Sequence, residues 1–139
     1  MFIKKVSPEY LNTHLNINMT SALGITYTEV GDQYICATMP VDERTTQPMG
    51  LLHGGASVVL AETLGSVASH LCVSDDYMCV GLEINANHVK SAIDGLVKGK
   101  ATPLHIGKKT HIWNIEIRNT NEELVCISRL TVAVISKKK

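Results

Sequence analysis

The sequence lacks the features that mark membrane-spanning, secreted and metal-binding proteins. No stretch of its 139 residues approaches the roughly 20 consecutive apolar residues that a membrane-spanning helix needs, so we expect no membrane association. The N-terminus also lacks the apolar segment of a secretory signal peptide, and a cytoplasmic location is expected. The four cysteines form no CxxC pair and no Cys/His spacing of a zinc site, which predicts free thiols and no bound metal.

An excess of charge of one sign is missing too. The 13 basic and 13 acidic residues balance, whereas a nucleic-acid binder usually carries a basic excess, so no nucleic-acid partner is expected. Residues 1–139 are 45% hydrophobic and 19% charged, which predicts one domain with a packed core. Several lysines nevertheless cluster, and charge alone leaves open whether they form a solvated surface or a patch for a phosphorylated ligand. They are Lys90, Lys98, Lys100, Lys108 and Lys109, with Lys137, Lys138 and Lys139 at the end of the chain.

Hydrophobic alternation predicts strands arranged around one long helix. Residues 23–30 and 33–39 alternate about a Gly-Asp turn and predict a β-hairpin, while residues 40–53 are polar and predict a loop. Residues 54–72 are apolar on nearly every side and long enough for five helical turns, a pattern typical of a helix that is buried all round. A short helix is predicted at residues 8–15, and further strands at residues 78–90, 95–102, 111–118 and 124–135.

Consecutive strands without intervening helices favour an antiparallel sheet. The predicted fold class is therefore α+β, with an antiparallel sheet wrapped around one long central helix. Such a sheet has edges that need protection, and pairing of two edges in a dimer would provide it.

The predicted central helix carries one conspicuous charge. Glu62 is the only ionisable side chain between Gly54 and Ser69. Burying a carboxylate without a partner is costly, so a chain rarely keeps one in a core without cause. From this helix alone, a glutamate that faces solvent or caps another element explains the residue equally well.

Residues near the start of the helix favour a chemical role for Glu62. His53 and Gln47 lie in the preceding loop, and Ser66 lies one turn after Glu62 on the same face. A glycine pair that includes Gly55 lets a ligand approach backbone N–H groups, where the helix dipole attracts negative charge. These parts suit thioester hydrolysis, which needs an oxyanion site together with a nucleophile or a base for water.

Helix geometry constrains how these groups can act together. Gly55 and Glu62 are seven residues apart, which is roughly 10 Å along a helix axis. One helix would struggle to present both groups to a single carbonyl carbon. We therefore hypothesise an active site at a subunit interface, with Gly55 from one chain and Glu62 from the other.

Four segments of the chain resemble a known enzyme family. They are residues 47–69, 80–92, 103–117 and 128–135. In these segments the chain resembles the hotdog-fold acyl-CoA thioesterases that hydrolyse aromatic acyl-CoAs, and the likeness covers roughly residues 20–135. It looks closest to the bacterial 1,4-dihydroxy-2-naphthoyl-CoA thioesterases of menaquinone synthesis, and it is similar to those of the phenylacetate and enterobactin pathways. The motifs are more specific for the fold and the reaction than for the acyl group.

The resemblance implies a catalytic role for five residues. Glu62 would be the nucleophile or general base, and Ser66 would orient the attacking water or hold Glu62. The backbone N–H of Gly55 would polarise the thioester carbonyl with help from Gln47. His53 would position the substrate.

The resemblance also implies substrate-binding residues and an assembly. His88 and Val89 would line the acyl pocket, although a hydrogen-bonded histidine near a strand end explains His88 equally well. The family needs no metal or organic cofactor, since CoA is part of the acyl-CoA substrate. It forms homodimers that commonly pair into homotetramers. The CoA nucleotide would contact Lys90, His105, Gly107, Lys108 and Lys109.

Two other hotdog functions are alternatives. An enoyl-CoA hydratase or dehydratase would use a His base with an Asp, and that signature is missing here. A non-catalytic acyl-CoA sensor usually loses the catalytic carboxylate and gains a DNA-binding segment, whereas Glu62 is present and only about twenty residues precede the matching region. A serine hydrolase is a weaker alternative, because no GxSxG motif occurs, and His53 and Glu62 do not form the HExxH pattern of a zinc protease.

Overall fold

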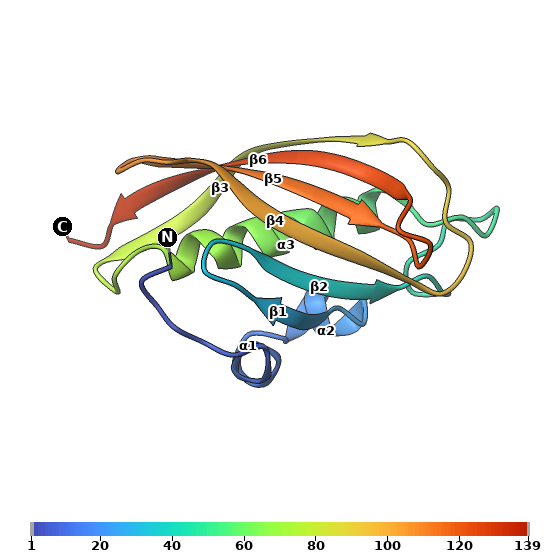
Figure 1. The fold of residues 1–139 in the computed structure, drawn as a ribbon, viewed down its shortest axis with the longest axis horizontal. Coiled ribbons are helices and arrows are strands. Elements are labelled where there is room, and N and C mark those ends of the chain that lie inside the picture. The colour runs from blue at the N-terminus through green and yellow to red at the C-terminus, as the bar shows by residue number, and fades with distance from the viewer. Residues whose placement is uncertain (1, 139) are drawn as a thin grey trace.

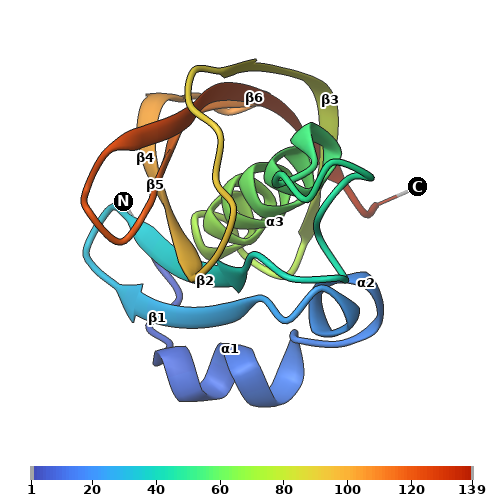
Figure 2. The same ribbon diagram turned by 90° about the vertical axis from the view of Figure 1, so that its right-hand side faces the viewer.

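In the computed structural model, which describes residues 2–138, a six-stranded sheet curves around one long helix (Figure 1, Figure 2). The helix is α3 (Gly54–Leu71), and the sheet order is β1-β2-β4-β5-β6-β3 with every neighbouring pair antiparallel. The α+β architecture predicted from the sequence is therefore confirmed. The strands are β1 (Thr26–Val30), β2 (Ile35–Pro40), β3 (Tyr77–His88), β4 (Leu96–Ile106), β5 (Thr110–Arg118) and β6 (Leu124–Ser136).

The N-terminal region contains one helix that the sequence pattern does not predict. The helix predicted at residues 8–15 is α1 (Pro8–His14), but a second helix, α2 (Asn18–Ala22), follows it. The strand predicted from residue 23 is consequently wrong at its start, because Leu23 caps α2 and β1 begins three residues later. Strand β4 also runs four residues beyond its predicted end. Met1 and Lys139 lie outside the described residues, so the domain and the terminal lysines are described only up to residue 138.

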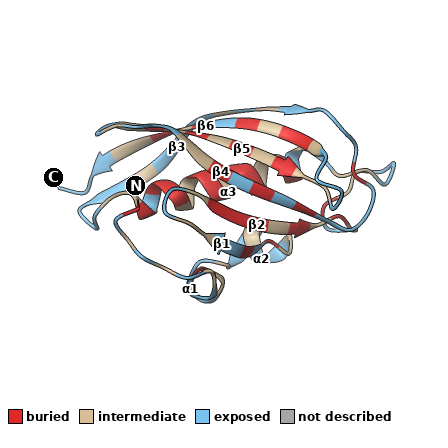
Figure 3. Ribbon diagram, viewed as in Figure 1, coloured by how far each residue is buried: buried red, intermediate tan, exposed pale blue. Residues whose placement is uncertain are grey.

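The core fills the space between α3 and the inner face of the sheet (Figure 3). The close approach of α3 to the sheet depends on Gly99 of β4, because a Cβ there would lie 2.7 Å from a methyl carbon of Leu64. The expectation of a helix buried all round is only partly correct within one chain, since one face of α3 remains half-buried. That face carries Val59, Glu62, Thr63, Ser66 and Val67.

The two edges of the sheet differ in how they are protected. On β1, the side chain of Asn12 accepts a hydrogen bond from the Tyr27 N–H and donates one to the Tyr27 carbonyl, both at 2.8 Å. Asn16 donates to the Ile25 carbonyl just before the strand. The 12-residue edge strand β3 instead presents large exposed hydrophobic side chains, a pattern that favours pairing with another chain. They are Tyr77, Met78, Val80 and Leu82.

The structure also describes the cysteines and the side chains that could hold a metal ion. The four cysteines, Cys36, Cys72, Cys79 and Cys126, are free. Within residues 2–138 we find no group of three or more His, Cys, Asp or Glu side chains placed to hold a metal ion. No helix of this region is both long and apolar enough to cross a membrane.

A buried histidine ties the sheet to the last turns of α3. His111 is 1% exposed, and its Nδ1 lies 2.9 Å from the hydroxyl of Ser69, which also accepts a 2.7 Å hydrogen bond from the Trp113 indole. Burial lowers the pKa of His111 below its ordinary value of 6.5, and a hydrogen bond with the Gly107 backbone opposes this shift. The neutral imidazole is thus the form that the native structure holds.

We expect this histidine to make stability depend on pH. Below pH 6.5 the unfolded chain binds a proton at His111 before the native chain does, so the free energy of unfolding falls as the pH falls. Chemical denaturation between about pH 7 and about pH 5 should show this loss, and His111→Gln should flatten it. A smaller loss of stability at low pH should persist in His111→Gln, because burial also lowers the pKa of His70. His14→Gln, on the exposed face of α1, is the control. If the free energy of unfolding of His111→Gln changed with pH as steeply as that of the parent, His111 would not be the source of the pH dependence.

Candidate active site

The start of α3 is capped by a side chain predicted to bind substrate. His53 is the N-cap residue, and its Nδ1 accepts a 2.8 Å hydrogen bond from the N–H of Gly55. A neutral His53 therefore carries its proton on Nε2. Gly55, whose N–H is predicted to donate to the thioester carbonyl, is engaged in this cap. His53 and Gly55 are both exposed, so a ligand oxygen can compete with the imidazole for that N–H.

The loop before α3 orients the side chain of Gln47. Its Oε1 accepts a 2.5 Å hydrogen bond from the N–H of Met49, while its backbone N–H donates to the Leu51 carbonyl. Since the amide oxygen is held within the loop, the amide NH₂ is the end that can donate to a ligand oxygen.

A cavity of about 320 Å³ joins this loop to the end of β3. It brings together Gln47, His88, Val89 and Lys90, all predicted from the sequence as site residues. Gly54 makes this possible, because a Cβ there would lie 2.7 Å from Nε2 of His88. Sequence reasoning missed five other lining residues, whose small or apolar side chains carry no chemical signal: Leu51, Leu52, Ser57, Ser91 and Val125.

Glu62 lies in a second cavity, of about 450 Å³. It shares this cavity with Ser66, as their spacing predicts, and most of the other lining residues are apolar. Among the described residues, none donates a hydrogen bond or forms an ion pair with the Glu62 carboxylate. Gly81 of β3 leaves room for it, because a Cβ at that position would lie 2.7 Å from Oε2 of Glu62. The carboxylate is therefore half-buried, next to apolar surface and available to a ligand.

The two cavities share no lining residue. Within one chain the helix start therefore does not meet Glu62, which agrees with their separation along the helix. If both sets act on one molecule, a second chain must bring them together.

The predicted CoA-contacting residues are likewise divided. Lys90 N–H bonds to the carbonyl of Val125 at one end of β6, whereas the carbonyl of Lys109 accepts from Val134, nine residues along that strand. Nine strand residues span roughly 30 Å, so the two lysines lie at opposite ends of the sheet. His105, Gly107 and Lys108 lie at the β4–β5 turn with Lys109.

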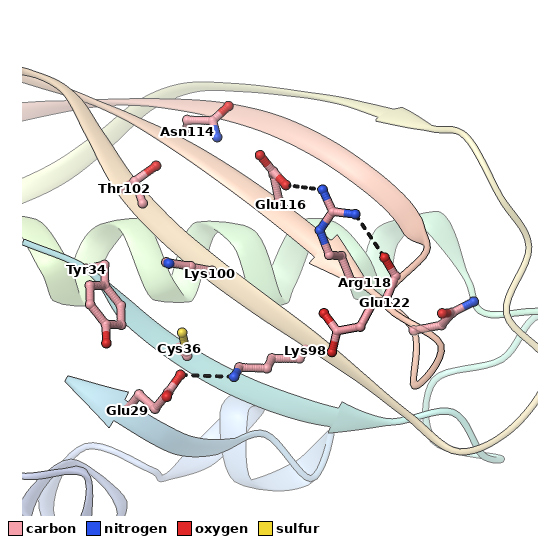
Figure 4. Close-up of a pocket in the computed structure, with 11 residues that line it drawn as sticks. Glu29, Tyr34, Cys36, Lys98, Lys100, Thr102, Asn114, Glu116, Arg118 and Glu122 are labelled. Atoms are coloured by element: carbon pink, nitrogen blue, oxygen red, sulfur yellow. Dashed lines mark hydrogen bonds and ion pairs between the residues drawn. The ribbon is translucent and has the colours of Figure 1, made fainter. Parts of the chain in front are cut away.

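Two further lysines of the cluster lie in the polar cavity of about 520 Å³ shown in Figure 4. Lys98 forms an ion pair with Glu29 at 2.9 Å, and the ammonium of Lys100 lies 4.4 Å from the centre of the Tyr34 ring. The neighbouring pair of Arg118 and Glu116 is 2.6 Å apart. Lys98 and Arg118 in this cavity are therefore paired locally, and the five lysines form no single patch within one chain.

Comparison with known proteins gives a consistent result. Residues 49–126 match the Thioesterase superfamily. The 1,4-dihydroxy-2-naphthoyl-CoA hydrolase of Escherichia coli is 52% identical over 132 residues, which cover 95% of this chain and 97% of that protein. The crystal structure of a thioesterase from Haemophilus influenzae superposes with a TM-score of 0.96 at 45% identity, covering 99% of this chain and 96% of the other.

A third relative has solved structures in which single residues are replaced. Two structures of a Staphylococcus aureus thioesterase are each 38% identical to this chain, with TM-scores of 0.83 and 0.81. They cover 86% and 88% of this chain, and 99% and 98% of their own. One carries alanine in place of a glutamate, and the other in place of a glutamine fifteen positions earlier.

The cap at His53 leads to a prediction about stability. His53→Ala removes the acceptor for the Gly55 N–H and should lower the free energy of unfolding by about 1 kcal/mol, whereas His53→Asn retains a capping oxygen and most of the stability. Urea denaturation of the three proteins measures the difference. Equal stability of His53→Ala and the parent would show that the cap contributes nothing.

Proposed function

This chain belongs to the thioesterase superfamily, and on that premise we propose that it hydrolyses an aromatic acyl-CoA to the free acid and CoA. The observation that carries the proposal is the available Glu62 carboxylate beside an apolar cavity. The best candidate substrate is 1,4-dihydroxy-2-naphthoyl-CoA, because the E. coli relative is named for its hydrolysis. The hydratase and sensor alternatives receive no such support.

Glu62 can act in either of two ways. As a general base it would take a proton from water while the water oxygen bonds to the carbonyl carbon, after which the C–S bond breaks and the CoA thiolate takes up a proton. As a nucleophile its carboxylate oxygen would displace the thiolate, and water would then hydrolyse the resulting anhydride. Gln47 and Glu62 are fifteen residues apart, the spacing of the two residues replaced in the S. aureus protein, which supports their assignment to one site.

Donors at the start of α3 would stabilise the oxyanion. The NH₂ of Gln47 and the N–H of Gly55 are suitable donors, and Gly55 becomes available when the exposed His53 ring turns away. Nε2–H of His53 would then add a third donor or hold the sulfur side of the thioester. Ser66 lies one helical turn after Glu62 and lines the same cavity, so its hydroxyl could position the attacking water.

A homodimer formed through β3 would complete the site. Antiparallel pairing of two β3 strands would place the His88 end of one strand beside the Tyr77 end of the other. The helix start beside His88 would then approach Glu62 of the partner subunit, which lies beside Gly81 of its own strand. The same pairing would carry the turn with Lys108 toward Lys90 of the partner subunit, which would make one CoA site from two distant ends. We expect such dimers to pair into a homotetramer in the cytoplasm, with no nucleic-acid or membrane partner.

The first test is thiol release from a panel of acyl-CoAs. The parent protein should release CoA from 1,4-dihydroxy-2-naphthoyl-CoA and benzoyl-CoA more efficiently than from medium-chain acyl-CoAs, measured with a disulfide reagent. Glu62→Ala and Glu62→Gln should each lower kcat by about 100-fold or more, because they remove the nucleophile or base. Near-normal turnover by Glu62→Ala would remove the central claim, and intact binding without release would favour a sensor.

The composite site is tested by mixing two inactive variants. In a dimer of Gln47→Ala and Glu62→Ala chains, one site keeps both residues and the other loses both. Random co-assembly should thus restore about a quarter of the parental activity, since half of the dimers are mixed and each has one intact site. If each chain holds a complete site, co-expression restores no activity.

A further inference from the structure

The chain before β1 forms one wall of the cavity around Glu62. This wall segment comprises residues 15–20, and five of its members line the cavity: Leu15, Ile17, Asn18, Met19 and Thr20. Helix α2, which begins within the segment, packs beside α3 (Figure 2). The opposite side is the half-buried face of α3. The segment lies outside residues 49–126, which match the thioesterase family, so the family match does not explain it.

The wall segment is fixed to the rest of the fold. Asn12, in α1, bonds to the backbone of Tyr27 in β1, and Asn16, in the turn that leads into α2, donates to the Ile25 carbonyl just before that strand. Asn18 has a φ of 57°, a left-handed conformation that Asn tolerates better than most residues. The hydroxyl of Thr20 donates a 2.8 Å hydrogen bond to the Ile17 carbonyl across this bend. These contacts hold Ile17 and Met19 at the cavity, although the two side chains are 59% and 62% exposed.

The chemistry of the cavity distinguishes between the two sides of a thioester. The carbonyl carbon must lie at Glu62, so one of its two substituents extends along this wall. The sulfur side leads to CoA, which is long, polar and charged, and the acyl side is the apolar one. Besides Glu62, the cavity offers aliphatic side chains, Tyr27 and a few small polar groups such as the hydroxyl of Thr63. An apolar ring with hydroxyl substituents fits this lining, and a nucleotide diphosphate does not.

We propose that Ile17 and Met19 form the wall of the acyl pocket and determine which acyl groups the enzyme accepts. The proposal rests on the proposed thioesterase function and extends it to residues of the N-terminal segment. The ring of the acyl group would lie between these two side chains and the Val59–Val67 face of α3. A wall of flexible methionine would adapt to rings of different size.

The test compares kcat/KM for three substrates with acyl groups of increasing size: acetyl-CoA, benzoyl-CoA and 2-naphthoyl-CoA. In Met19→Ala and Ile17→Ala, the ratio of kcat/KM for naphthoyl-CoA to that for acetyl-CoA should fall by about tenfold, the scale of lost apolar contacts in a pocket. Met19→Leu conserves volume and should retain the parental ratio. Ile93→Ala is the matched control, because Ile93 is 66% exposed and lies outside the cavity.

Each outcome decides the proposal. An equal change for all three substrates would overturn it, since a specificity wall must act on the acyl group. A shift in sedimentation of the wall variants, without a change in the substrate ratio, would also overturn it and assign the wall to subunit contact. Failure of the proposed function has a different signature, because the parent would then release no thiol or Glu62→Ala would match it.

Discussion

The fold depends on a helix that is apolar on nearly every side and therefore needs cover on every side. The sheet covers one side of α3 through close contacts such as those at Gly99, but the side with Glu62 is covered only in part. One sheet edge is sealed by Asn12, and the other, β3, is not. The surfaces left open after folding are thus the helix face that carries the carboxylate and the strand beside it. Substrate binding at the helix face and pairing of β3 would share a physical origin, because each would remove apolar surface from water.

Two sets of site residues lie far apart in the single chain, and one arrangement of two chains would bring both sets together. Along α3, two helical turns divide the donors at Gly55 from Glu62, and along the sheet the strand length divides Lys90 from Lys109. Antiparallel pairing of β3 reverses the direction of the second chain and would close both gaps at once. Each site would then contain the helix start of one subunit and the helix middle of the other, which would let a small domain build a large substrate site.

Much of the fold was predictable, because its signals are local and periodic. Alternation identified the strands, the apolar run identified α3, and the four-residue spacing of Glu62 and Ser66 correctly placed both in one cavity. Helix α2 was not predictable, since five residues carry no period and its shape follows from Asn18 and from contacts with α3. The cap between His53 and Gly55 was also missed. A histidine can bind a ligand or a backbone N–H, and only the folded backbone shows which partner is nearest.

The small contact between Gly81 and Glu62 links two positions that lie nineteen residues apart and on different layers. A methyl group at position 81 would occupy the space of a carboxylate oxygen, although the strand itself would accept alanine. Under selection for folding alone, position 81 is free to drift. Under selection for turnover, glycine is favoured there, because a larger side chain would displace the carboxylate of Glu62. The two sites would then evolve as an epistatic pair, and glycine on this strand would mark lineages in which the helix carboxylate is still in use.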